Sequence, residues 1–148
     1  MTGKSEFTEE EWRLVLEGPP VAGMLVITAQ GGGSFRESFA LARAYADARK
    51  QHGESELLDE IVSEKPALDR KRYGSPEKLQ EDGLPRLREA VALLKRKATA
   101  AEVEDYRSFV LNLAGKVAEA HKEGGERTSP AEQAAIDQIG VSLGAQAS

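Results

Sequence analysis

One helix-start signal occurs four times along this chain and divides it into helical segments. Each copy is a serine or threonine followed three residues later by a glutamate: Thr8 with Glu11, Ser34 with Glu37, Thr99 with Glu102, and Ser129 with Glu132. In such a capping box the hydroxyl accepts from the amide of the glutamate, and the carboxylate accepts from the amide of the capping residue. Four of these signals in one chain predict an all-α fold.

The apolar residues that follow these signals repeat at helical spacing. The clearest series is Tyr106, Val110, Leu113 and Val117, with steps of four, three and four residues, which places these side chains on one face of a helix. Counting all such segments, we expect about seven helices. In the segment 34–52, the same spacing predicts an inner face of Phe35, Phe39, Ala42 and Ala46.

Prolines and glycines suggest where helices end. Gly18, Pro19 and Pro20 follow one another, and we expect the first helix to stop there, because a proline lacks the amide that a helix interior needs. A second, buried helix is then expected over 21–29. Residues 64–83 contain prolines, glycines and a basic run, which predicts a connecting segment.

A different interpretation makes residues 24–28 a strand, because they are partly β-branched. Gly31, Gly32, Gly33 and Ser34 would then form a phosphate-binding turn of a nucleotide-binding enzyme. No other segment offers a strand to pair with, and an isolated strand cannot satisfy its backbone. We therefore favour a helix over 21–29.

The chain also contains a diverged internal repeat, about 8–52 and about 99–144. Trp12 matches Tyr106, and Glu37 matches Glu132. The pairs Ala22 with Ala114 and Val26 with Val117 match as well. Two such copies predict two helix–loop–helix halves related by pseudo-symmetry within one domain, residues 1–148.

Composition narrows the class of protein. A chain of 148 residues suits one domain. It has no cysteine, which excludes disulfides and thiolate chemistry, and no apolar run long enough for a transmembrane segment. The N-terminus has no apolar stretch of the kind found in signal peptides, so we expect a cytoplasmic protein. The net charge of −5 argues against nucleic-acid binding.

The segment 121–128 suggests a metal site. It contains Glu123 and Glu126 beside two glycines, and Glu132 follows. Calcium and magnesium prefer several oxygen ligands around a tight turn, so Glu123, Glu126 and Glu132, with Glu37 from the other half, are candidate ligands for a divalent cation. The alternative is a solvated loop in which Glu132 only completes its capping box. The two histidines, His52 and His121, have no second histidine at helical spacing, and no catalytic residues can be assigned, so we do not expect an enzyme.

These motifs together resemble a known family. Residues 113–120, the glycine-bearing acidic segment, Glu132 followed by Ala135 and Ile136, and the closing residues 139–144 are similar to TerB-like tellurite-resistance proteins. The resemblance spans about residues 10–144. It implies a small cytoplasmic all-helical domain with two pseudo-symmetric halves, metal binding and a role in stress response. In that family each loop typically carries an Asp-Gly pair, whereas this chain has Gln30-Gly31 in the first loop and a shifted Glu123-Gly124 in the second.

The resemblance implies a non-enzymatic function in tellurite or stress resistance, through weak binding of calcium or magnesium or through a protein partner. The alternative is a helical interaction scaffold without a metal site. We expect a protein partner, and either a monomer or a homodimer.

Overall fold

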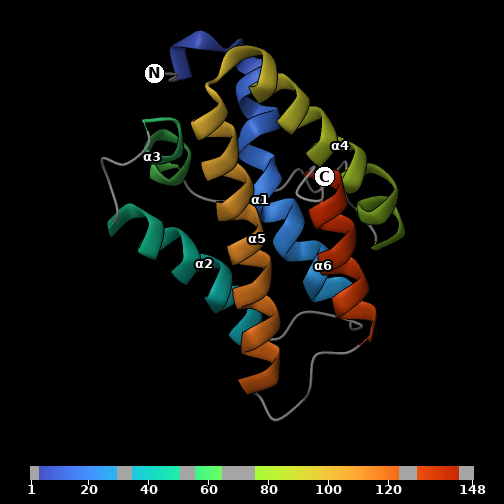
Figure 1. Ribbon diagram of the computed structural model, residues 1–148. Helices are drawn as coiled ribbons and strands as arrows, with labels where there is room; N and C mark the ends of the chain where they lie inside the picture. The colour runs from blue at the N-terminus through green and yellow to red at the C-terminus, as the bar shows by residue number, and fades with distance from the viewer. Residues whose placement is uncertain (1–3, 30–34, 51–55, 65–75, 124–129, 144–148) are drawn as a thin grey trace.

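The computed structural model describes residues 4–29, 35–50, 56–64, 76–123 and 130–143 (Figure 1). Throughout these residues the protein is all-helical, as the capping signals predict. A short 3-10 turn, η1 (Lys4–Glu6), precedes six α-helices: α1 (Glu9–Ala29), α2 (Phe35–Lys50), α3 (Glu56–Ser63), α4 (Pro76–Lys97), α5 (Ala100–Glu123) and α6 (Pro130–Ser142). None of these described helices combines the length and the apolar content of a membrane span.

Helices α1 and α5 form the centre of the molecule (Figure 1). Helix α4 packs along α1, and α6 packs against α1, α4 and α5, so these four helices form a bundle. Helices α2 and α3 pack against each other and against α5. The core therefore lies around α5, and its predicted face (Tyr106, Val110, Leu113 and Val117) is completely buried.

Two of the four predicted capping boxes lie in described residues, and both are formed. The Thr8 hydroxyl accepts from the Glu11 amide at 3.1 Å, and the Thr8 amide donates to the Glu11 carboxylate at 2.9 Å. Thr99 and Glu102 make the same reciprocal pair at 3.1 and 3.0 Å. Ser34 and Ser129 lie outside the described residues.

The predicted end of the first helix at Gly18-Pro19-Pro20 is wrong. Helix α1 continues through both prolines to Ala29, so one helix replaces the two that were expected, and the strand over 24–28 is excluded. Pro19 cannot donate to the carbonyl of Val15, four residues earlier. The Tyr106 hydroxyl donates to that carbonyl instead, at 2.8 Å in the buried core.

Gly18 lets the Tyr106 hydroxyl take the place of the missing Pro19 amide. A Cβ at Gly18 would overlap the Tyr106 hydroxyl and would lie 3.1 Å from Cζ of the same ring. The absence of a side chain therefore lets the α5 tyrosine reach the α1 backbone. Beside it, the buried carboxylate of Glu17 pairs with Arg86 of α4 at 2.9 Å, so a charged pair as well as a hydrogen bond ties α1 to its neighbours.

The predicted connector over 64–83 is also partly wrong, because α4 already begins at Pro76. Gly83 and Pro85 lie inside this helix. A Cβ at Gly83 would approach Cγ1 of Val21 to 2.9 Å, so the glycine serves close packing of α4 on α1 and does not break the helix.

The predicted inner face of α2 needs a correction as well. Ala42 and Ala46 are exposed, and Ala44 and Tyr45 are buried instead. The Tyr45 ring meets Phe109 of α5 edge-on, with ring centroids 5.4 Å apart, so this large aromatic side chain lies on the inward face of α2. The side chains of Phe35 and Phe39 lie outside the described part.

Candidate functional site

The N-terminal end of α1 carries Trp12, the single tryptophan of the chain. The capping box at Thr8 and Glu11 fixes the start of this helix, and the preceding turn brings Phe7 over the indole, with ring centroids 5.6 Å apart. Trp12 is almost completely buried. A buried indole needs an acceptor for its N–H group, and Glu64 at the end of α3 provides it, at 2.7 Å.

Lys97, at the C-terminal end of α4, holds this turn from the other side. Its ammonium group donates to the Glu11 carboxylate at 2.8 Å and to the Glu6 carbonyl at 3.0 Å. It also lies 5.6 Å from the centroid of the Phe7 ring. The hydrogen bond from Lys97, followed by the one from the Thr8 amide, lowers the pKa of Glu11. The start of α1 is therefore fixed by α4 as well as by its own cap.

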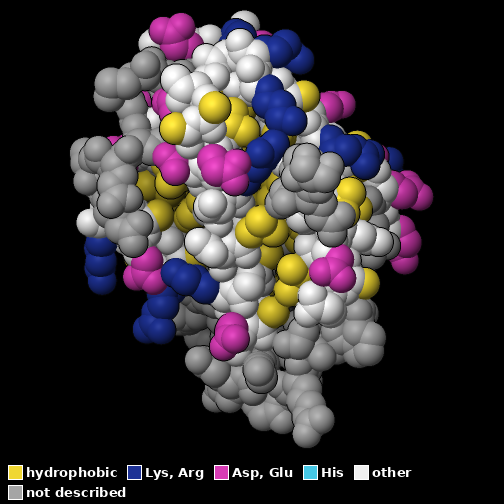
Figure 2. Space-filling view, in the orientation of Figure 1, with side chains coloured by type: hydrophobic (Ala, Val, Ile, Leu, Met, Phe, Trp, Pro, Cys, Tyr) yellow, Lys and Arg dark blue, Asp and Glu magenta, His cyan; other side chains and the backbone are white. Residues whose placement is uncertain are grey.

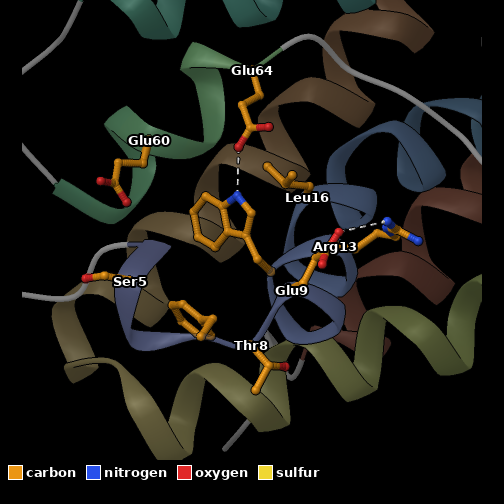
Figure 3. A pocket seen from close by; sticks show the side chains of 9 residues that line it. Ser5, Thr8, Glu9, Arg13, Leu16, Glu60 and Glu64 are labelled. Carbon is orange, nitrogen blue, oxygen red and sulfur yellow. Dashed lines mark hydrogen bonds and ion pairs between the residues drawn. The ribbon is translucent and has the colours of Figure 1, made fainter.

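A hollow of about 760 Å³ opens between the start of α1 and α3 (Figure 3). Its lining residues are Ser5, Phe7, Thr8, Glu9, Trp12, Arg13, Leu16, Glu60 and Glu64. Figure 3 shows Glu60 on α3 and Glu64 directly after that helix, and it shows Glu9 and Arg13 on α1. Arg13 pairs with Glu9 at 3.7 Å, and both side chains are largely exposed.

The described residues give this hollow a mixed lining. They contribute apolar side chains, carboxylates, hydroxyls and one guanidinium. Its volume falls within the range of about 300–1,000 Å³ that is common for ligand pockets.

The predicted metal ligands are not tested by this structure. Glu126 lies outside the described residues. Glu37, Glu123 and Glu132 fall in α2, α5 and α6, but their side chains lie outside the described part of the chain. Within the described residues, no group of three or more His, Cys, Asp or Glu side chains is placed to hold a metal ion.

One part of the metal prediction does need a correction. The segment 121–128 was expected to be a loop, but α5 extends to Glu123. His121 and Glu123 are therefore on a helix, whereas Gly124 and Gly125, where the tight turn was expected, lie outside the described residues.

Sequence reasoning missed the hollow. Glu60 and Glu64 are separated by four residues, which places them on one face of a helix, and this spacing was visible in the sequence. Their position opposite Trp12, which is 52 residues from Glu64 in the chain, follows only from the packing of α3 against the rest of the molecule.

Over the described residues the protein is an all-helical bundle with a hollow of mixed apolar and polar lining beside the start of α1. No protein-family model, curated protein or solved structure matches the chain.

Proposed function

We propose that this chain is a non-enzymatic binding protein that engages a protein partner through the hollow beside Trp12. The observation that carries the proposal is the hollow itself, which combines the rings of Phe7 and Trp12 with a rim of charged side chains. Sites that recognise partners commonly combine an apolar centre with polar groups at the edge. A role in tellurite or stress resistance, as the TerB-like resemblance implies, remains a prediction.

The remaining described surface offers less. Val141 is the one large hydrophobic residue in the described part of the chain that is classed as exposed. On the face shown in Figure 2, hydrophobic side chains appear as separate groups between acidic and basic ones. The described hydrophobic side chains on this face do not join into a continuous apolar patch of the size typical of a hydrophobic interface. This face therefore supports no alternative site.

A matched pair of variants tests the proposal. A displayed library of random peptides is selected on the full chain, and the recovered peptides are titrated while Trp12 emission is recorded. Ser5 lines the hollow, whereas Ser108 is exposed on α5, so Ser5→Tyr should block the hollow and Ser108→Tyr should not. We expect Ser5→Tyr to weaken binding at least about tenfold. The proposal is wrong if no recovered peptide distinguishes the two variants.

Metal binding by Glu37, Glu123, Glu126 and Glu132 is a separate prediction with its own test. Thermal unfolding is measured with chelator and then with excess calcium or magnesium. A cation that binds only the folded state at about a hundredfold excess over Kd stabilises by about 2.7 kcal/mol, which Glu126→Gln should abolish. An unchanged melting temperature with both ions would remove this version of the function.

A further inference from the structure

Residues 4–7 form a strap across the start of α1. They comprise the turn η1 and Phe7, and Phe7 covers the indole of Trp12, with ring centroids 5.6 Å apart. The strap also supplies Ser5 and Phe7 to the lining of the hollow, and Figure 3 shows Ser5 and Glu64 on different sides of the indole. The strap is therefore one wall of the hollow, and its position decides how far Trp12 is covered.

Lys97 of the neighbouring helix α4 holds the strap in place. Its ammonium group donates to the Glu6 carbonyl at 3.0 Å and lies 5.6 Å from the centroid of the Phe7 ring. The same group donates to the Glu11 carboxylate at 2.8 Å, in the first turn of α1. One charge on Lys97 thus joins the strap, α1 and α4.

These contacts are of a kind that opens easily. Ser5 and Glu6 are exposed and Phe7 is only partly buried, so closing the strap buries little apolar surface. The side chains of Lys97 and Glu11 are 34% and 28% exposed, and ion pairs at such positions contribute little because water competes for them. Segments with few buried contacts open locally at a much lower free energy than the core. The strap can therefore open while the helical bundle stays folded.

We propose that the strap opens and closes over Trp12, that Lys97 is its latch, and that the closed strap completes the hollow for a partner. A partner that binds the closed form shifts the equilibrium toward that form. A change that removes the charge of Lys97 opens the strap and weakens partner binding. The part of this inference that concerns the partner rests on the proposed function, whereas the latch can be tested without a partner.

The latch is tested by limited proteolysis of the full chain. Thermolysin cuts before large apolar residues, and it reaches the bond before Phe7 when the strap is open. If opening is fast, the rate of this cut follows the population of the open form. Lys97→Met removes the charge, and we expect it to speed the cut about two- to fivefold, which is the effect of losing one exposed ion pair. Lys95→Met, at an exposed position of α4, is the matched control and should leave the rate unchanged.

A second cut separates opening of the strap from unfolding of the whole protein. Leu113 is completely buried in α5, so a cut before this residue requires the bundle to unfold. Mass spectrometry follows the two products separately. Urea below the unfolding transition should speed the cut before Leu113 and hardly change the cut before Phe7, because the effect of urea scales with the surface that opening exposes. An equal response of both cuts to urea would mean that the strap is released only by global unfolding, and the latch would be wrong.

The peptides recovered by selection on the full chain test the role of the closed strap in binding. A peptide that binds only the closed form should slow the cut before Phe7 about a hundredfold at about a hundredfold excess over Kd. A scrambled peptide controls for competition at the protease. The selected peptide should also bind Lys97→Met more weakly than wild type, because less of that variant is closed.

The outcomes separate the two proposals. If Lys97→Met is cut before Phe7 at the wild-type rate, the latch is wrong, whether or not peptides bind the hollow. If Lys97→Met is cut faster but peptides that Ser5→Tyr blocks leave the rate unchanged, the closed strap does not complete the binding site and the inference is wrong. If no peptide depends on the hollow, the proposed function is wrong, and the control of partner binding by the strap is wrong with it.

Discussion

Tyr106 is the residue on which the packing of α1 against α5 depends most directly. Its ring is fully buried, and its hydroxyl donates at 2.8 Å to the Val15 carbonyl. A buried carbonyl without a donor costs about 1–3 kcal/mol. Tyr106→Phe should therefore lower the free energy of unfolding by about this amount, measured by urea denaturation. A change within about 0.5 kcal/mol, typical of a surface substitution, would show that the bond contributes nothing to stability.

Gly18 provides a second test of the contact between Tyr106 and the backbone of α1. Gly18→Ala alone places a methyl group into the Tyr106 hydroxyl, and the ring atom behind it is 3.1 Å away. Because Tyr106→Phe removes the overlapping oxygen, the two substitutions together should cost less than the sum of their separate effects. Additive costs in a double-mutant cycle would contradict direct contact between the two residues.

Glu11 makes the start of α1 sensitive to acid. Its folded-state pKa is lowered from the ordinary value of 4.5, first by the hydrogen bond from Lys97 and then by that from Thr8. A lowered folded-state pKa gives stability that is complete above the unfolded-state pKa and is lost as the pH falls through the folded-state value.

Glu11→Gln keeps a capping-box residue but removes the charge, so it isolates this effect. We expect wild type to exceed the variant in denaturation midpoint at pH 7, and we expect the difference to disappear well below pH 4.5. NMR titration of the Glu11 carboxyl should give a midpoint below the ordinary glutamate value of 4.5. A difference between the proteins that is constant down to about pH 2 would contradict a role for the ionised carboxylate.

At the scale of elements, α1 shows why the helix boundaries were only partly predictable. Local signals were sufficient where the partner was local: the capping boxes at Thr8 and Thr99 connect residues three positions apart, and both are formed. The helix end expected at Pro19 does not occur. The hydrogen bond that Pro19 cannot donate to Val15 is donated by the Tyr106 hydroxyl, 91 residues from Val15 in the chain. No local pattern in residues 9–29 contains that information.

The same distinction applies to the candidate site. The buried face of α5 could be predicted, because four apolar residues at helical spacing define it. The hollow could not, because Trp12 is on α1 whereas Glu60 and Glu64 lie at the end of α3, and only the packing of the two helices brings them together. In α2, spacing alone favoured Ala42 and Ala46, but alanines contribute little buried area. Tyr45, which contacts Phe109, is on the buried face instead.

The proline in α1 gives a prediction at this scale. Pro19→Ala restores an amide that can donate to the Val15 carbonyl. In the Tyr106→Phe background this amide replaces the lost donor, so Pro19→Ala should recover much of the lost stability. In the wild-type background it should help less, because the carbonyl already has a donor. The free energy of unfolding is measured by urea denaturation in both backgrounds. If Pro19→Ala changes it equally in the two, the Tyr106 hydroxyl does not replace the amide that Pro19 lacks.

At the scale of the whole molecule, one buried tyrosine joins two helices of the central bundle, and another joins the bundle to the flanking helix α2. Tyr106 lies between α5 and α1, and Tyr45 of α2 lies against α5. Burial raises the pKa of both phenols far above the ordinary value of 10.0. In the unfolded chain, in contrast, both should ionise near the ordinary value of about 10.

This difference predicts alkaline unfolding. A raised folded-state pKa gives stability that is complete below the unfolded-state value and is lost as the pH rises through the folded-state value. The protein should therefore lose stability above about pH 10. After a jump to high pH, tyrosinate absorbance from Tyr45 and Tyr106 should appear only at the rate of unfolding, followed in parallel by circular dichroism. The chain has three tyrosines, so each of Tyr45→Phe and Tyr106→Phe should remove one tyrosine's share of the slow signal. Immediate ionisation of all three would mean that water reaches both rings in the folded state, and that α2 and α1 do not seal the core around α5.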